Sequence, residues 1–433
     1  MIYLILVFGL ALRLISLNQS LWLDEATSAL AAKMNIVELF TKFLPGDFHP
    51  PLYYLILKSW SELFGYSEMA LRFPSIIFGV FTIYIVYLIG KNLFNENVGM
   101  VASLFLATSG LHVYYSQEAR TYSLAALLVT TLIYLFLKKK WILFSIILAT
   151  LSMTDYISLL MIPVFWLFSS KEWKKLVLSH IPVFAVFAVW LPIFIKQLVS
   201  GVSLEGSDWW NILGIVTFKN ITLVPTKFIL GRISFDDKLS YAIVVLVAIC
   251  LFSFLLFKAR KGSKLLWGWL VLPIVFGVLI SFKIPTLTYF RYLFCLPALY
   301  LLVSTGIENS GKFSKILLIS IVSINIMSTF YYLTNSRFQR EDWRSAAKAI
   351  GTQKIIFPAN SQKEALIYYD KGGQIVNISD LNTKDKEIWL SRYVWEIFDP
   401  KDVVRLKIES LGYNRTQEYN FNGVVFYKYA NSN

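Results

Sequence analysis

The chain contains 433 residues, of which 56% are hydrophobic, 16% are aromatic and only 16% are charged. Soluble globular domains carry roughly 25% charged residues, so this composition excludes an ordinary soluble protein and predicts one that lies mostly in lipid. The net charge of +14 does not indicate nucleic-acid binding, because many basic residues form short clusters between apolar runs, as in polytopic membrane proteins. Cys250 and Cys295 both lie inside apolar runs, which predicts free thiols.

The apolar runs predict about eleven transmembrane helices. A spanning helix needs about 20 apolar residues, with about 17 as the lower end, and three of the runs are short enough that their full crossing stays open. The start of the chain has no basic leader and no small-residue cleavage site, so the first run is predicted to be a retained helix rather than a cleaved signal. The predicted spans are Met1–Leu17, Ala70–Ile89, Val98–Leu111, Ala119–Leu137, Trp141–Met153, Tyr156–Phe168, Leu176–Leu198, Leu239–Phe257, Leu265–Phe282, Phe290–Gly306 and Ile316–Leu333.

The basic clusters predict how these spans are oriented. With a cytoplasmic N-terminus, alternating spans place every cluster on the inside, which is the orientation that membrane proteins prefer. The loops 18–69, 112–118 and 200–238, and everything after Leu333, then lie outside the cytoplasm. We therefore expect an integral protein of the cell membrane. The clusters are Lys91, Lys138 to Lys140, Lys171 to Lys175, Lys258 to Lys264, and Lys312 with Lys315.

The first outer loop, residues 18–69, is too long and too amphipathic to be a simple connection. Apolar residues recur at helical spacing in Asp24–Met34 and again in Pro51–Phe64. Both segments are predicted to be helices that lie along the membrane surface, with the apolar face toward the lipid. The transmembrane domain, residues 1–334, thus carries an ordered polar loop on its outer side.

The composition changes after Thr334, where charged and apolar residues become mixed. Alternating helical and strand patterns predict that residues 335–433 form a small α/β domain outside the cytoplasm. The domain has no glycine-rich phosphate loop, so no catalytic role is assigned to it. The predicted helices are Glu341–Ile350, Gln362–Tyr369 and Pro400–Leu411, and the predicted strands are Lys354–Phe357, Gln374–Ile378, Glu387–Ser391 and Val424–Tyr429.

Two groups of polar residues in the first outer loop are candidate functional residues. Asp24 and Glu25 follow the first span by about one turn, where they are either solvated charges, a helix N-cap or functional groups. Arg13 lies near the outer end of that span, where a charged side chain costs free energy unless it is paired or functional. His49 precedes a rigid Pro50-Pro51 step into a helix, and it is either an inert loop residue or a ligand for a phosphate or a metal.

Two later segments on the outer side also carry charges at the start of spans. Glu118 and Arg120 are expensive in a helix entering the bilayer unless they face a protein cavity, although an interfacial ion pair is an alternative. Arg291 is either a snorkelling anchor or a fork for a phosphate. A carboxylate that deprotonates a hydroxyl, together with cations that hold a phosphate, would suffice to transfer a group from a lipid phosphate.

Five segments occur in an order that resembles the C-type (GT-C) glycosyltransferases, in the branch of the dolichyl-phosphate-mannose protein mannosyltransferases and the bacterial aminoarabinose transferases of lipid A. The resemblance is clear from Met1 to about Asp155, and weaker up to Leu333, where topology and Arg291 carry it. Bacterial relatives often have a lysine where this chain has His49. The segments are LWLDEA, HPPLYY, SEMALRFPSIIFG, YYSQEARTYSL and FRYLFCLP.

The resemblance implies a GT-C-like fold and a sugar donor linked to polyprenyl phosphate. It also implies transfer with inversion, outside the cytoplasm, to a protein, lipid or glycan hydroxyl. Asp24 corresponds to the family's proposed catalytic base. In this hypothesis Glu25 and Glu118 orient the acceptor or a metal, and the donor phosphate is bound by Arg120, Arg291 and His49.

The resemblance leaves the role of several other residues open. Further site candidates are Arg13, Tyr53, Tyr122 and Tyr289. A divalent cation (Mg²⁺, Mn²⁺ or Zn²⁺) held by His49, Glu25 and Glu118 is a tentative cofactor, and the alternative is that His49 contacts the phosphate without a metal. The competing function is a flippase or transporter of a lipid-linked oligosaccharide, but such proteins place charges near the bilayer midplane and often contain repeats, which this sequence lacks.

Overall fold

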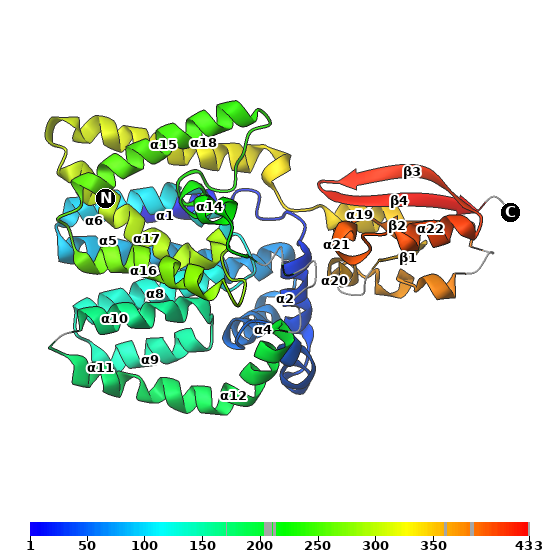
Figure 1. Cartoon of the computed structure of the whole chain (residues 1–433), viewed down its shortest axis with the longest axis horizontal. Coiled ribbons are helices and arrows are strands. Elements are labelled where there is room, and N and C mark those ends of the chain that lie inside the picture. The colour runs from blue at the N-terminus through cyan, green and yellow to red at the C-terminus, as the bar shows by residue number, and fades with distance from the viewer. Residues whose placement is uncertain (170, 203–209, 211–213, 359–361, 382–384, 432–433) are drawn as a thin grey trace.

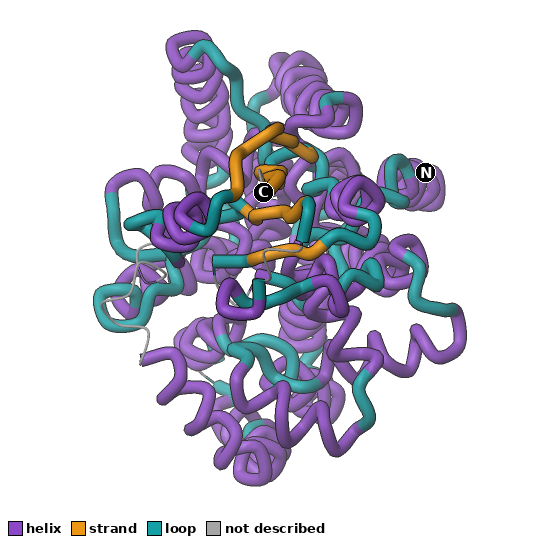
Figure 2. Tube along the Cα trace, turned by 90° about the vertical axis from the view of Figure 1, so that its right-hand side faces the viewer, coloured by secondary structure: helices purple, strands orange, loops and turns teal. Residues whose placement is uncertain are grey.

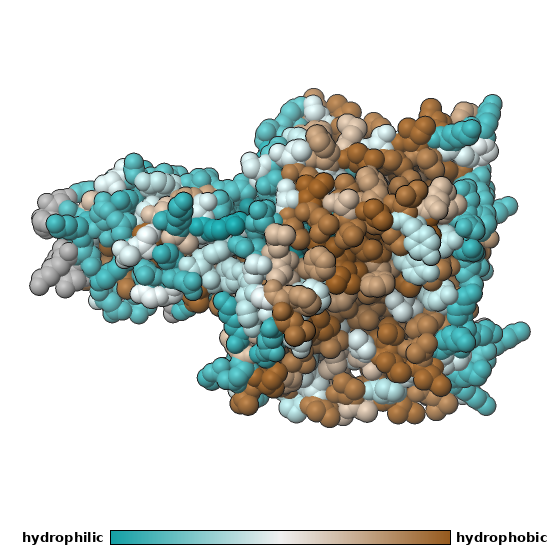
Figure 3. Space-filling view, turned by 180° about the vertical axis from the view of Figure 1, so that it is seen from behind, coloured by the Kyte–Doolittle hydropathy of each residue, from teal (hydrophilic) through white to brown (hydrophobic). Residues whose placement is uncertain are grey.

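The computed structural model describes residues 1–169, 171–202, 210, 214–358, 362–381 and 385–431. A large helical part is followed by a small sheet domain at one end of the molecule (Figure 1). Exposed apolar side chains cover the helical part, whereas the sheet domain is polar (Figure 3). The hydrophobic surface over the helices is what a protein in contact with lipid requires, and it agrees with the composition.

Every predicted span lies on a helix. Five helical stretches are long and apolar enough to cross a membrane, a bent pair would make a sixth, and five more apolar helices have 10–17 residues in the described part of the chain. The full count of eleven spans therefore stays a prediction. The helices concerned are α1 (Ile2–Leu14), α5 (Glu68–Leu93), α6 (Glu96–Thr108), α7 (Gly110–Ser116), α8 (Tyr122–Leu137), α9 (Trp141–Ser152), α10 (Ile162–Phe168), α11 (Trp173–Ser179), α12 (Ile181–Val202), α15 (Lys238–Lys258), α16 (Lys264–Ile280), α17 (Leu296–Glu308) and α18 (Ser314–Thr334).

The bent pair consists of α6 and α7, which meet at an angle of 63°. Arg13, fully buried on α1, donates to Gly9 O at 2.7 Å and to Ala107 O at 3.1 Å, and it lies 2.6 Å from His112 Nδ1. A helix end leaves its last carbonyls without partners inside the helix, and the guanidinium supplies donors for them here. Arg13, predicted as a site candidate, therefore has the contacts of a residue that stabilises the bend.

The first outer loop contains the two predicted surface helices. They are α2 (Leu23–Lys33) and α4 (Leu52–Phe64), and α3 (Ile36–Glu38) lies between them. Both lie at the end of the helical part that faces the sheet domain (Figure 1). The N-cap of α2 is Trp22, without a side-chain hydrogen bond, and Asp24 and Glu25 are in the first turn. The N-cap interpretation of the acidic pair is therefore wrong, although both carboxylates lie at the positive end of the helix dipole.

The predicted loop 200–238 also contains an unforeseen helix, α14 (Phe218–Leu230), while the middle of this loop lies largely outside the described residues. Two short helical segments matter for the site because they begin spans on the same side. They are η3 (Ile157–Met161), which leads into α10, and η4 (Tyr289–Cys295), which leads into α17.

The sheet domain contains one sheet with strand order β1-β2-β4-β3. β1 and β2 are parallel, and the other two neighbouring pairs are antiparallel. Viewed from its own side, the sheet lies in front of the helical part (Figure 2). The elements are β1 (Lys354–Ile356), β2 (Glu387–Ser391), β3 (Tyr413–Phe421), β4 (Val424–Asn431), α19 (Trp343–Ile350), α20 (Glu364–Tyr368), α21 (Trp395–Phe398) and α22 (Val403–Ser410).

One predicted strand is wrong, and one strand of the sheet was not predicted. The predicted strand 374–378 makes only a single bridge, between Ile375 and Ile355, and its ends belong to 3-10 turns. Strand β3 was missed because, as an edge strand, it is mostly exposed and polar and gives no clear apolar alternation. The turn between β3 and β4 is formed by Asn422 and Gly423, which both have positive φ. An Asn-Gly pair is the usual sequence signal for such a two-residue hairpin turn.

The sheet domain is attached to the first outer loop by direct contacts. Tyr369 Oη accepts from Leu21 N at 2.9 Å and donates to Glu68 at 3.0 Å. Tyr368 Oη donates to Tyr66 O at 2.6 Å. Because α20 also packs against α2, the helix that carries Asp24 is held between the membrane helices and the sheet domain.

Candidate functional site

Asp24 and Glu25 are neighbours in sequence but point in different directions from α2. Consecutive helical residues are about 100° apart around the axis, so they face different surroundings. The Asp24 side chain is 39% exposed, and its Oδ2 lies 3.7 Å from Nη2 of Arg120. Glu25 is completely buried. The accessible carboxylate of the pair is therefore Asp24.

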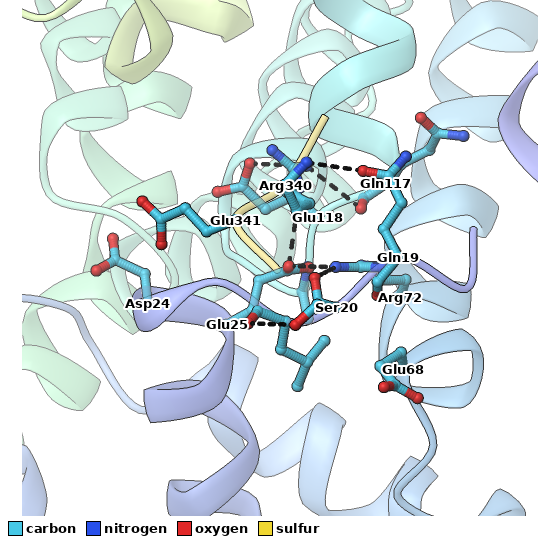
Figure 4. A network of polar contacts seen from close by, with 12 residues as sticks. Gln19, Ser20, Asp24, Glu25, Glu68, Arg72, Gln117, Glu118, Arg340 and Glu341 are labelled. Carbon is cyan, nitrogen blue, oxygen red and sulfur yellow. Dashed lines mark hydrogen bonds and ion pairs between the residues drawn. The ribbon is translucent and has the colours of Figure 1, made fainter. Parts of the chain in front are cut away.

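Glu25 is bound by a bidentate ion pair. Arg72 donates from Nε to Glu25 Oε1 at 2.8 Å and from Nη2 to Oε2 at 2.5 Å, and Ala119 N donates to Oε1 at 2.9 Å (Figure 4). Burial alone would raise the pKa of Glu25, but Arg72, together with Arg340 and the Ala119 N–H, outweighs burial and lowers the pKa. Both oxygens have partners, so these contacts suit a structural carboxylate better than the predicted acceptor- or metal-orienting one.

Arg72 also ties down the chain before α2. Its Nη1 and Nη2 donate to the backbone oxygens of Leu17, Gln19 and Ser20 at 2.6–2.9 Å. Sequence reasoning missed Arg72 as a functional residue. It lies within the quoted segment SEMALRFPSIIFG, where an arginine in an apolar run already indicates a partner. Arg72 thus sets the position from which α2, and with it Asp24, begins.

A second buried pair joins the sheet domain to the site. Arg340 Nη2 lies 3.1 Å from Glu118 Oε2, and Arg340 Nε lies 3.8 Å from Glu25 Oε2 (Figure 4). The guanidinium also lies over the ring of Tyr114, 3.7 Å from its centroid. Burial and the nearby Glu25 charge raise the pKa of Glu118 well above its usual value. Arg340 was not predicted from the sequence, because nothing local indicates its partners.

On the open side of Asp24, charged groups follow one another in a row. Arg120 Nη2 lies 3.7 Å from Asp24 and 3.4 Å from Nε2 of His49, and His49 Nδ1 lies 3.4 Å from Asp47 Oδ2. Tyr54 Oη donates to the same Asp47 oxygen at 2.6 Å. Burial favours neutral Asp47, but His49 and Arg120 outweigh it and hold the pKa of Asp47 well below its usual value. The structure thus brings together the predicted Asp24, His49 and Arg120.

Arg291 reaches the same region from η4. Phe290, the neighbour of Arg291 in η4, packs against Tyr122 with the ring centroids 5.2 Å apart. Arg120 and Arg291 both act electrostatically on Tyr122, and Arg291 and His49 both act on Asp155. Burial raises the pKa of Asp155, which was not predicted as a site residue although it marks the limit of the clear resemblance. Arg291 also donates to Pro285 O at 3.0 Å. Two predicted phosphate-binding arginines are therefore close to the same aromatic residue.

The remaining predicted residues have mainly structural contacts. Tyr53 is 1% exposed, and its Oη lies 3.2 Å from Ser75 Oγ. Tyr289 interacts with Tyr115, a buried residue on α7. Tyr122, by contrast, is acted on electrostatically by both Arg120 and Arg291.

The predicted metal site does not form. No group of three or more His, Cys, Asp or Glu side chains in the described part of the chain is arranged to hold a metal ion. Both Glu25 oxygens bind Arg72, Glu118 faces Arg340, and His49 lies beside Arg120. Each of the three predicted ligands thus lies beside an arginine, and the structure does not bring His49, Glu25 and Glu118 together as a metal site.

The chain is similar to known proteins in part of its sequence and in its fold. Residues 48–199 match the family model of dolichyl-phosphate-mannose-protein mannosyltransferases. No curated protein sequence matches the chain. The fold is similar to that of ArnT from Cupriavidus metallidurans in the apo state, with a TM-score of 0.63 at 10% identity over 98% of this chain and 97% of that one.

Two further structures share the fold. ArnT from the same organism bound to undecaprenyl phosphate has a TM-score of 0.59 at 9% identity, again over 98% and 97% of the two chains. The Archaeoglobus fulgidus oligosaccharyltransferase in complex with Zn and sulfate has a TM-score of 0.57 at 13% identity over 99% of this chain and 73% of that one. The family match and the shared fold confirm the resemblance to the C-type glycosyltransferases, in the branch of the mannosyltransferases and aminoarabinose transferases.

Proposed function

We propose that the protein is a membrane glycosyltransferase that moves a sugar from a polyprenyl phosphate to an acceptor hydroxyl. The observation that carries this proposal is the row Asp24–Arg120–His49, where an accessible carboxylate lies beside cationic groups that suit a phosphate. Undecaprenyl phosphate is bound by ArnT, and a dolichol-phosphate is bound by the archaeal oligosaccharyltransferase, both of which share this fold. These relatives support a lipid-phosphate donor here.

In the proposed reaction Asp24 removes the proton from the acceptor hydroxyl. The hydroxyl oxygen forms a bond to the anomeric carbon while the bond from that carbon to the phosphate oxygen breaks, and the configuration is inverted. The phosphate leaves with the electron pair and remains on the lipid. Arg120 and Arg291, with His49, stabilise its negative charge, which is the largest electrostatic demand of the step. Nε of Arg120 is buried and has no hydrogen-bond partner within the described chain, so it can donate to the phosphate.

The direct test is to incubate the purified protein with a panel of polyprenyl-phosphate sugars and to measure the release of free lipid phosphate. At least one donor should be consumed by the wild type and not by Asp24→Asn. The proposal is overturned if undecaprenyl phosphate does not bind and no donor in the panel is consumed.

Lysine substitutions should separate donor binding from acceptor binding. An arginine fork holds a phosphate with two hydrogen bonds, whereas a lysine offers a point charge. Arg120→Lys and Arg291→Lys should each raise the KM for the donor about tenfold and change the KM for the acceptor much less. Steady-state kinetics with each substrate varied in turn measures this, and a larger effect on the acceptor would contradict the phosphate role. Arg260→Lys, on an exposed cytoplasmic-side turn, is the matched control and should change neither constant.

The contacts of His49 with Arg120 and Asp47 predict catalysis that does not require a metal bound at His49. We expect His49→Lys to keep activity within a few-fold of the wild type, because lysine preserves a donor beside Asp47, and His49→Ala to lose more. We also expect EDTA to leave turnover unchanged. Loss of activity on chelation, restored by Mn²⁺ or Zn²⁺ but not in His49→Lys, would instead support a metal bound at His49.

The active site and sheet domain are proposed to lie outside the cytoplasm, on the strength of the lysine clusters. In a background with Cys250→Ser and Cys295→Ser, a cysteine at exposed Ser379 of the sheet domain should react with a membrane-impermeant thiol reagent in intact cells. A cysteine at exposed Lys312, in a predicted cytoplasmic loop, should react only after lysis. The reversed labelling pattern would invert the topology.

A further inference from the structure

The sheet domain reaches the site through Arg340, whose backbone is fixed at both its amide and its carbonyl. Arg340 N donates to Gln19 Oε1 at 2.8 Å, and Asn422 Nδ2 donates to Arg340 O at 2.8 Å. Gln19 lies in the first outer loop just before α2, whereas Asn422 belongs to the turn between β3 and β4. The outer loop and the sheet domain together therefore determine where the Arg340 side chain begins.

The Arg340 side chain ends on the last turn of α7 and on the residues that follow it. Its Nη2 donates to Tyr114 O at 3.3 Å and to Gln117 O at 3.4 Å, and the same nitrogen lies 3.1 Å from Glu118 Oε2 (Figure 4). The last carbonyls of a helix have no partner inside the helix, and arginine side chains are suitable donors to them. Arg340 of the sheet domain thus caps a helix of the membrane domain.

The capped end of α7 leads directly into the turn that carries Arg120. Residues 117–121 lie between α7 and α8 and belong to neither helix. Such residues lack the backbone hydrogen-bond ladder of a helix, so contacts with other segments hold them in place. All five residues are buried, and a shift of the turn would move Arg120 with it. The position of Arg120 therefore depends on what holds this turn.

The turn is held from two sides. From the membrane domain, Glu25 Oε1 accepts from Ala119 N at 2.9 Å, and Arg72 fixes Glu25. From the sheet domain, Arg340 contacts the two residues before Ala119, and its Nε lies 3.8 Å from Glu25 Oε2. Two buried arginines, one from each domain, thus hold the residues that immediately precede Arg120.

We propose that Arg340 is a positioning residue for the donor: by holding the turn 117–121, it places the Arg120 guanidinium beside Asp24 and His49, where the lipid phosphate binds. This inference rests on the proposed function and gives the sheet domain a part in it. The Arg340 side chain is only 2% exposed, so it acts through Arg120 and not on the phosphate itself. The sheet domain completes the donor-phosphate site without touching the donor.

The test measures the affinity of the purified full-length protein for undecaprenyl phosphate, and the KM for donor and acceptor with a donor that the wild type consumes. Arg340→Gln removes the charge and the fork that hold the turn. It should weaken undecaprenyl phosphate binding and raise the donor KM, each by about tenfold, and it should change the acceptor KM much less. All values are compared at equal amounts of folded protein.

A double-mutant cycle separates positioning from a general loss of structure. Arg120→Gln removes the proposed phosphate-binding group, so adding Arg340→Gln to this variant should weaken undecaprenyl phosphate binding by less than about twofold further. Effects of independent sites multiply, which would give a further loss of about tenfold. Full multiplication of the two effects would overturn the positioning role.

Two further substitutions keep the test decisive if Arg340→Gln fails to fold. Asn422→Gly removes the amide that binds Arg340 O but suits the positive φ, which glycine adopts without strain. It should fold and bind undecaprenyl phosphate a few-fold more weakly. Tyr368→Phe is the matched control, because it removes a different hydrogen bond of the sheet domain, to Tyr66 O at 2.6 Å, and it should leave binding unchanged.

The outcomes distinguish the two proposals. If undecaprenyl phosphate binds and a donor is consumed, but Asn422→Gly binds the lipid as tightly as the wild type, the role of Arg340 is overturned while the glycosyltransferase proposal stands. The same holds if Arg340→Gln raises the acceptor KM as much as the donor KM, or if Tyr368→Phe weakens binding as much as Asn422→Gly. If no donor is consumed and undecaprenyl phosphate does not bind, the two proposals fall together.

Discussion

Replacing Asp24 by asparagine should lower glycosyl transfer by about 10²–10⁴-fold, the usual contribution of a general base. The amide cannot accept the hydroxyl proton at neutral pH, although it keeps the size of the carboxylate. Folding should be little affected, because the Asp24 side chain is 39% exposed and its ion pair with Arg120 is long, at 3.7 Å. Transfer rates measured with equal amounts of folded protein check this prediction.

The matched control for this substitution is Glu38→Gln. Glu38 lies in the same outer loop, its side chain is 41% exposed, and it pairs with Lys42 at 3.1 Å. This variant removes one negative charge from the same surface and should leave transfer unchanged. Asp24→Asn should still bind undecaprenyl phosphate, because the donor phosphate is assigned to other residues. Turnover of Asp24→Asn within a few-fold of the wild type would remove Asp24 from the role of base.

Replacing Arg72 by leucine should destabilise the protein by about 3–5 kcal/mol, the cost of removing one partner of a buried ion pair. The two side chains are 1% and 0% exposed, so the substitution leaves the Glu25 charge without its main partner and without water. It also removes the donors to three backbone oxygens before α2. Thermal unfolding of the detergent-solubilised protein measures the loss.

Two comparison variants make this result specific. Arg72→Leu combined with Glu25→Leu should recover part of the lost stability, since no charge is then left buried without a partner. Lys91 lies on the same helix, α5, and pairs with Glu96 of α6. The two side chains are 50% and 57% exposed, so Lys91→Leu should hardly change the unfolding temperature. Equal losses for Arg72→Leu and Lys91→Leu would show that burial of the pair does not matter.

The sequence was sufficient to place the long apolar helices and most of the charged row. The membrane helices could be predicted without tertiary information, because a helix in lipid must satisfy its own backbone and be mostly apolar, and every predicted span falls on one helix or on two consecutive helices. Asp24, His49, Arg120 and Arg291 were predicted together since charges at the same end of successive spans face the same side of the membrane. Edge strand β3 was missed because its polar residues carry no burial pattern.

The residue types alone could not distinguish Asp24 from Glu25, because both are acidic and adjacent, and only the family resemblance favoured Asp24. What separates them is the direction in which α2 presents each side chain and the placement of Arg72, 47 residues away from Glu25, opposite one of them. The contact between Glu118 and Arg340 joins residues more than 200 positions apart, and only packing of the sheet domain onto the helices creates it.

Local physical chemistry, namely hydrophobicity and helical spacing, thus determined the apolar helices and the two helices of the first outer loop, and charge bias predicts the side of the membrane on which the polar groups lie. The tertiary structure alone decided which carboxylate is accessible and which buried charges pair with one another, including the pair of Glu118 with Arg340 of the sheet domain. The reason is that burial and ion pairing depend on distances between segments far apart in the chain, and composition or periodicity carries no information about those distances.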